Sequence, residues 1–136
     1  MKGMLHAAIG FASDDQGNGV AYVRVAGTKA ERVLRVPFGV KRFGGLRGRE
    51  VGYAALHAVA EVLRRHVNGG VTFLLDDPVL AGDLREHREV PAALTLAYVR
   101  LRCALNQFAR YEIAESGGES DLTARARSEL ALHVAA

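Results

Sequence analysis

The residues of this chain that are best suited to hold a charged partner form a basic segment from Lys41 to Arg49. The segment carries four positive charges, on Lys41, Arg42, Arg47 and Arg49, together with three glycines and one phenylalanine. Lysine and arginine contact phosphate oxygens, and glycines let the chain follow a nucleic-acid backbone. These four residues are therefore the candidates for nucleic-acid contact. The alternative interpretation is a solvated connector between two regular elements.

Carboxylates gather at three places in the sequence. Asp14 and Asp15 lie among turn-forming residues, which favours a solvated turn. Asp76 and Asp77 follow an apolar run, and either of them can act as the N-cap of a short helix. Asp121 precedes a helical pattern and can cap it in the same way. Taken alone, each group has a purely structural interpretation.

Other chemical motifs are missing from the sequence. There is no phosphate loop, no nucleophile elbow and no zinc pattern. The single cysteine, Cys103, lies in a helical pattern, so no internal disulfide can form and we expect an apolar, buried role for it. The five histidines lack metal-ligand spacing: His6, His57, His66, His87 and His133.

Strand patterns occupy the first third of the chain. Residues 5–12, 20–25 and 32–38 are rich in apolar and β-branched side chains, and short turn-forming stretches separate them. Short connections join antiparallel neighbours, so we expect a three-stranded antiparallel meander.

Helices and single strands alternate in the rest of the chain. Apolar residues recur at helical spacing from 49 to 66, from 91 to 108 and from 121 to 134, and a short helix is expected after Asp77. Strands are expected at 71–75 and 110–114. A helix that follows each single strand indicates parallel pairing, so the sequence predicts an α/β fold with a mixed sheet covered by helices.

Length and composition are those of one globular domain spanning 1–136. Apolar residues make up 49% of the 136 residues, and the net charge of +3 permits a polyanionic partner. No apolar run approaches the ~20 residues that span a bilayer. The first four residues carry one charge and no apolar stretch, so we expect a cytoplasmic protein without a secretory signal.

The element order and four local stretches resemble the type 1 branch of the ribonuclease H-like superfamily. Gly17-Asn18 matches the pair that precedes the family's second strand, and counting back places Ala12 at its first catalytic aspartate. The segment 51–56 is similar to the family's Ala-Glu-Tyr-x-Ala-Leu helix, with Gly52 at the catalytic glutamate. Asp76 and Asp121 match the two remaining catalytic aspartates.

This resemblance implies a five-stranded mixed sheet flanked by helices and a site of four carboxylates that hold two Mg²⁺ or Mn²⁺ ions. Such ions take oxygen ligands and activate a phosphodiester for hydrolysis. Ala12 and Gly52 have no ligand atom, so Asp76 and Asp121 remain as a half-site that holds one ion weakly, if any. Asp14 is a candidate replacement ligand. Glu50 is not, because on a helix it points about 200° away from Gly52.

Three hypotheses follow. The first is a catalytically impaired ribonuclease H-like protein that binds nucleic acid, such as an RNA–DNA hybrid, or a partner protein. The second is an active metal-dependent ribonuclease H that recruits Asp14 or Asp15. The third is a structural or self-associating module without a nucleic-acid role.

Overall fold

The computed structural model describes residues 4–27, 31–41, 48–67, 69–86, 89–116 and 120–135, and residues 133–135 by their backbone alone. Its elements are, in chain order, β1 (Leu5–Ser13), β2 (Asn18–Ala26), β3 (Glu31–Gly39), α1 (Arg49–Arg64), β4 (Gly70–Leu75), α2 (Pro78–Arg85), a 3₁₀ turn (Ala92–Leu94), α3 (Thr95–Leu105), β5 (Arg110–Glu115) and α4 (Asp121–Ala135). No described helix is long and apolar enough to cross a membrane.

The five strands form one mixed sheet in the order β3-β2-β1-β4-β5. The pairs β1–β2 and β2–β3 are antiparallel, whereas β1–β4 and β4–β5 are parallel. This confirms the predicted meander and the predicted parallel strands. The parallel pairs bring the carboxyl ends of β1, β4 and β5 to one edge of the sheet, where loops and helix ends converge.

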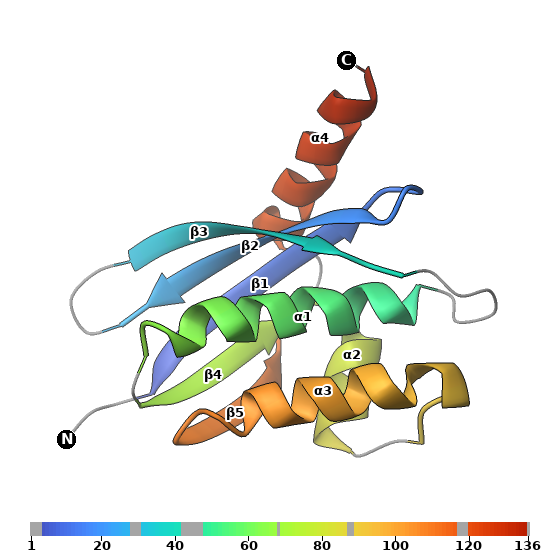
Figure 1. Cartoon of the computed structure of the whole chain (residues 1–136). Coiled ribbons are helices and arrows are strands. Elements are labelled where there is room, and N and C mark those ends of the chain that lie inside the picture. The colour runs from blue at the N-terminus through green and yellow to red at the C-terminus, as the bar shows by residue number, and fades with distance from the viewer. Residues whose placement is uncertain are drawn as a thin grey trace.

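The helices lie in two layers (Figure 1). α1, α2 and α3 cover one face of the sheet, and α4 crosses the other face over β1 and β2. Side chains of β1 point alternately to the two faces of the sheet. Ala7 and Ile9 belong to the large core under α1, whereas Ala8 and Ala12 pack against α4. The pleat of a strand sends successive side chains to opposite faces, so one short strand holds both layers in place.

Two predictions for the helical pattern from 91 to 108 need correction. The pattern from 91 to 108 is a 3₁₀ turn followed by α3, which ends at Leu105, and Phe108 lies beyond it with its ring 5.7 Å from that of Phe73. Phe108 fits the apolar spacing although it lies beyond the helix, because its side chain reaches the core from the turn that follows α3. The expectation of a buried Cys103 is wrong, since its side chain is exposed on α3.

Candidate functional site

The Asp76 carboxylate binds the first turn of α4. Its Oδ2 atom accepts hydrogen bonds from the Ser120 backbone N at 2.9 Å, the Ser120 Oγ at 3.1 Å and the Thr123 Oγ1 at 2.6 Å. The neighbouring Asp77 turns the other way and caps α2 through the backbone N of Val79 and Leu80. Of the two aspartates, Asp77 is therefore the α2 cap, while Asp76 fastens α4 to the end of β4.

Gly10 is the β1 residue that lies beside Asp76. The parallel register pairs Ile9 with Leu75, and its next step brings Gly10 level with Asp76, two residues before Ala12. A Cβ on Gly10 would lie 2.2 Å from the Thr123 backbone N and 2.5 Å from the Leu122 carbonyl carbon. The first turn of α4 thus occupies the space into which a side chain at position 10 would extend.

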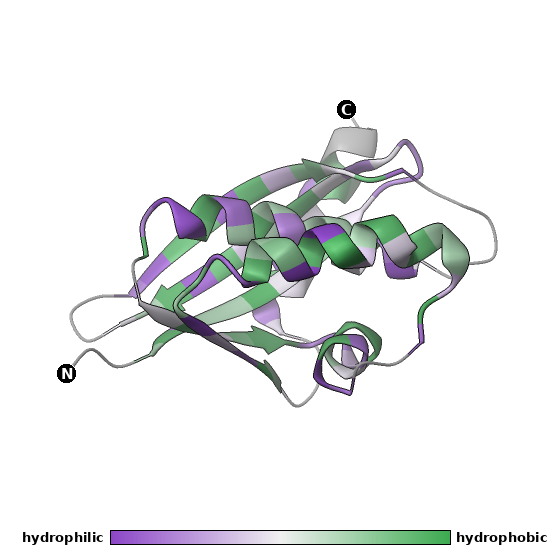
Figure 2. Cartoon of the chain, turned by 60° about the horizontal axis from the view of Figure 1, so that its bottom comes forward, coloured by the Kyte–Doolittle hydropathy of each residue, from purple (hydrophilic) through white to green (hydrophobic). Residues whose placement is uncertain are grey.

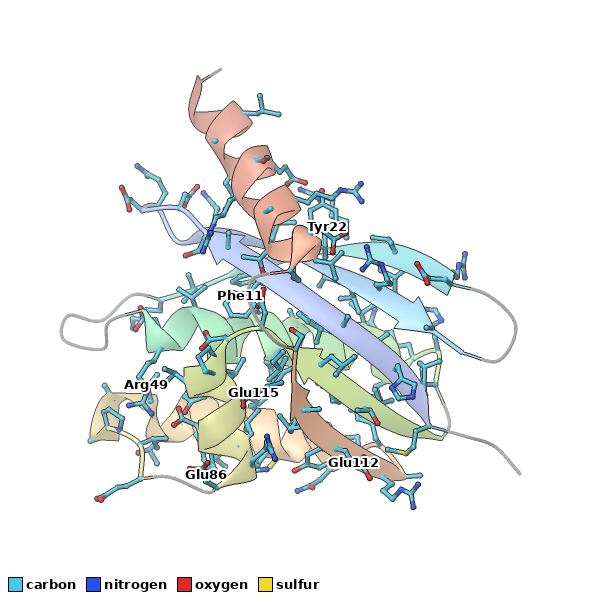
Figure 3. All side chains as sticks on the ribbon, turned by 180° about the vertical axis from the view of Figure 1, so that it is seen from behind. Phe11, Tyr22, Arg49, Glu86, Glu112 and Glu115 are labelled. Carbon is cyan, nitrogen blue, oxygen red and sulfur yellow. The ribbon has the colours of Figure 1, made fainter. Side chains whose placement is uncertain are left out.

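Ala12 lies in the small core under α4. It packs against a cluster that includes Leu122 and Ala126, with Val20 and Tyr22 from β2. Figure 3 shows Tyr22 beneath α4 and Phe11 on the opposite face of the sheet. The position identified with the family's first aspartate is therefore an apolar contact of α4.

Asp121 is the first residue of α4 and forms an ion pair with Arg24 on β2. Two hydrogen bonds, of 3.3 and 2.6 Å, join the Arg24 guanidinium to the carboxylate. The Arg24 hydrogen bond lowers the pKa of Asp121. The N-cap interpretation for Asp121 is wrong, because Ser120 occupies that place and its Oγ accepts from the Thr123 backbone N.

Gly52 faces an apolar contact between α1, α2 and β1. A Cβ on Gly52 would lie 3.3 Å from Leu80 Cδ2 and 3.5 Å from Phe11 Cζ. A carboxylate at this position would be surrounded by hydrocarbon, which disfavours the charged form. Glu50 lies elsewhere, since it is buried beside β3 in a groove between α1 and α3.

The carboxylates do not converge on a divalent cation. Asp14 accepts hydrogen bonds from the backbone N of Gln16 and Asn18, at 2.8 and 2.9 Å, within the β1–β2 turn. Among the residues that the structure describes, no three histidine, cysteine or acidic side chains are placed to hold a metal ion. With Asp76 bound to α4 and Asp121 bound to Arg24, the donor set does not fit two magnesium or manganese ions, which need several shared oxygen ligands.

The basic segment is described only at its two ends. Arg42 and Arg47 lie outside the described residues, while Lys41 is exposed two residues beyond the end of β3. Arg49 opens α1 and points inward, where its Nη2 lies 2.6 Å from the Asp83 Oδ2. Much of the Arg49 charge therefore compensates a buried carboxylate.

Asp83 is a buried charge that the sequence analysis did not identify. It is 1% exposed on α2 and accepts a second hydrogen bond, of 2.6 Å, from the Tyr53 hydroxyl. Burial, and then the hydrogen bond to Asp83, raise the pKa of Tyr53. The sequence pattern that could have identified it is an aspartate among the apolar residues of a short helix, because a carboxylate buried there needs a hydrogen-bonding or charged partner. This cluster ties the start of α1 to α2.

Comparison with known proteins identifies the architecture. No family model and no curated protein matches the sequence. The crystal structure of RNase H1 from the halophilic archaeon Halobacterium salinarum matches with a TM-score of 0.71 at 20% identity, over 97% of this chain and 99% of that one. The N-terminal RNase H domain of a Mycobacterium tuberculosis protein, solved as a fusion with maltose binding protein, matches with a TM-score of 0.64 at 14% identity, over 96% and 98%. The chain therefore has the ribonuclease H-like fold.

Proposed function

We propose that this chain is a ribonuclease H-like domain that binds nucleic acid without cleaving it. The observation that carries the proposal is the engagement of Asp76 by α4: three donors from Ser120 and Thr123 hold one oxygen of the carboxylate, Oδ2, and so compete with a metal ion for it. Two-metal hydrolysis requires carboxylates that share ions a few Å apart. Gly10, Ala12 and Gly52, at the positions discussed above, have no side-chain oxygen that could act as a ligand.

Binding is assigned to the segment 41–49. Its charges on Lys41, Arg42 and Arg47 suit phosphate oxygens, and the fold is shared with the two RNase H proteins named above. Arg49 is a weaker candidate, because its guanidinium already pairs with Asp83. We therefore assign the contact to the first three residues, and the proposed ligand is an RNA–DNA hybrid or a structured RNA or DNA.

The first test is cleavage of a labelled RNA–DNA hybrid in Mg²⁺ and in Mn²⁺. We expect no cleavage, and we expect 10 mM of either ion to stabilise the chain by less than about 0.4 kcal/mol, the linkage value when the dissociation constant equals the ion concentration. Metal-dependent cleavage that Asp76→Asn abolishes would overturn the proposed inactivity and favour an active nuclease.

The second test is hybrid binding followed by fluorescence anisotropy over a salt series. Neutralising Lys41, Arg42 and Arg47 together with Gln removes three phosphate contacts, so the slope of log K against log salt should become shallower by about 2–3. Arg65→Gln at the far end of α1 is the matched control and should leave the slope nearly unchanged. Absence of binding at low salt would remove the nucleic-acid half of the proposal and leave the structural or self-associating module.

A further inference from the structure

The outer edge of β3 presents backbone groups that point away from the sheet. β3 ends the strand order, and among the described residues only β2 pairs with it. The Val40 backbone N donates to the Gly17 carbonyl, one step beyond the last register pair of the two strands. Bonded residues alternate along an antiparallel pair, so the even-numbered residues of β3 bond to β2. The N–H and C=O groups of Glu31, Val33 and Arg35 therefore point outward.

Pro37 agrees with this alternation and limits the open part of the edge. Proline has no N–H, so a strand tolerates it where its nitrogen faces away from the ladder. It prevents full pairing near the end of β3 but leaves residues 31–35 open. The register to β2 runs without interruption from Glu31 to Gly39, so no bulge twists this edge away from a partner. Its charged side chains admit only a strand whose charges are complementary.

Residues 31–35 are complementary to a second copy of themselves. Hydrophilic positions interrupt the apolar ones along β3 (Figure 2), and Val33 has 42% of its surface exposed. Antiparallel pairing of two copies about Val33 sets Val33 opposite Val33 and Glu31 opposite Arg35 of the other copy. Each of these pairs exchanges backbone hydrogen bonds, and opposite charges directly across a pair attract. Arg32 would lie opposite Leu34, where its hydrocarbon stem can cover that side chain.

Both charged side chains already have partners within the chain, and these partners extend the match. Glu31 Oε1 lies 3.4 Å from Arg24 Nε. The Arg35 guanidinium binds Glu129 through Nε at 2.8 Å and Nη2 at 2.6 Å. Pairing of two copies would bring Glu31 of one beside Arg35 of the other. The resulting row alternates in sign: Arg24, Glu31, Arg35, Glu129. It holds as many cations as carboxylates, so the contact requires no uncompensated charge in either copy.

α4 favours the register that is centred on Val33. Glu129 fixes α4 to Arg35 on β3, and the last turns of the helix extend beyond this edge (Figures 1 and 3). In this register the Arg35 positions of the two copies lie four residues apart along the strands, or about 13 Å. Helices pack about 8–10 Å apart, so the two α4 helices fit side by side. Pairing centred on Arg35 would bring both helices to one point and set two guanidinium groups opposite each other.

Leu132 would form the apolar contact between the two α4 helices. It has 72% of its surface exposed. Helical spacing places it on the same side of α4 as Asp121 and Arg125. Asp121 pairs with Arg24, which is the β2 residue opposite Val33. This side of α4 therefore faces the axis of the strand pair, where Leu132 of one copy approaches Leu132 of the other.

We propose that this chain forms a symmetric dimer through antiparallel pairing of two β3 strands about Val33. The pairing joins two five-stranded sheets into one and sets both α4 helices on the same face. The partner is a second copy of the chain, because a strand of unrelated sequence would not match Glu31 and Arg35. Dimerisation does not depend on nucleic-acid binding, since the segment 41–49 begins beyond the other end of β3.

The first test is sedimentation velocity from micromolar to millimolar protein concentration. The mean mass should rise from that of a monomer towards that of a dimer. Val33→Lys sets like charges directly opposite and should raise the dimer dissociation constant at least about tenfold. The matched control is Val79→Lys, because Val79 on α2 is 44% exposed and lies away from β3. Leu132→Lys should also weaken the dimer, whereas Leu96→Lys on α3 should not. Circular dichroism checks that each variant is folded.

The second test exchanges charges across the strand pair. Glu31→Arg alone sets arginine opposite arginine, and Arg35→Glu alone sets glutamate opposite glutamate, so each variant should be monomeric. An equal mixture of the two variants should restore a mixed dimer, because every new side chain then faces an opposite charge. Thermal melts measure what each substitution costs within one chain. A purely structural role of these residues predicts no recovery in the mixture.

Disulfide cross-linking tests the register. In a Cys103→Ser chain, Val33→Cys should form a disulfide between copies under mild oxidation, since bonded residues of an antiparallel pair lie about 5.5 Å apart between Cα atoms. Pro37→Cys is the control and should not cross-link, because its two copies would be eight residues apart along the strands, or about 26 Å.

Four outcomes would overturn the proposal. One is a monomer at every concentration, and another is a dimer that Val33→Lys does not weaken. The third is a mixture of the two charge variants that stays monomeric although both are folded. The fourth is faster cross-linking through position 37 than through position 33. Loss of hybrid binding in a chain that still dimerises would count against the proposed function alone.

Discussion

Replacement of Gly10 by alanine tests whether the first turn of α4 occupies the space beside Asp76. The added Cβ would lie 2.2 Å from the Thr123 backbone N, against an ordinary contact of at least 3.4 Å. The obstacle is backbone, which cannot rotate away as a side chain can. The first turn of α4 must therefore move by about 1 Å, a displacement that a well-packed interior resists.

The expected cost has two parts. Overpacking of this kind costs about 1–3 kcal/mol. A shift of α4 also stretches the hydrogen bonds from Ser120 and Thr123 to Asp76, each worth about 1 kcal/mol. The reduced entropy of the unfolded chain returns about 0.4–1 kcal/mol. We expect a net loss of about 2–4 kcal/mol in the free energy of unfolding, or about 8–16 °C in Tm for a domain of this size.

Urea denaturation followed by circular dichroism measures this loss, with Gly69→Ala as the matched control. A Cβ on Gly69 would meet no atom within 4 Å, so its free energy of unfolding should change by less than about 0.5 kcal/mol. If Gly10→Ala proved as stable as Gly69→Ala, the close approach of α4 to β1 would be refuted. The position of the first turn of α4, on which the hydrogen bonds from Ser120 and Thr123 to Asp76 depend, would be called into question with it.

Other substitutions test the remaining contacts. Asp76→Ala leaves three donors without their acceptor and should cost about 1–3 kcal/mol in urea denaturation, with earlier loss of α4 amide protection in hydrogen exchange. Gly52→Glu places a charge against hydrocarbon and should lower Tm, whereas Gly52→Ala should be neutral or stabilising. Folding raises the pKa of Tyr53. Its contribution to the free energy of unfolding is therefore present below the unfolded pKa near 10 and is lost as pH rises above that value. Tyr53→Phe should make the decline in stability at alkaline pH less steep. The pKa of Asp121 is lowered by Arg24, so its contribution to stability is lost as pH falls below about 4. Arg24→Gln should make Tm in thermal melts depend less on pH in this acidic range.

Local patterns were sufficient for most of the secondary structure. Strand and helix periods, together with turn residues such as Gly17-Asn18, predicted all five strands and the four main helices. Period and turn chemistry depend on residues near one another in the chain, which is why they can be read from it. The exposure of Cys103 could not be read in this way, because it depends on which face of α3 meets α1.

The sequence by itself determined which side-chain ligands are missing. The side chains of glycine and alanine carry no oxygen, so Ala12 and Gly52 cannot bind a metal ion through a side chain in any conformation. Only the tertiary structure decided what the remaining carboxylates do. Asp76 binds Ser120, which is 44 residues away, and Asp121 binds Arg24, which is 97 residues away. Such contacts depend on strand order, parallel register and the close passage of α4 over Gly10, and these are set by packing between segments that no local pattern connects.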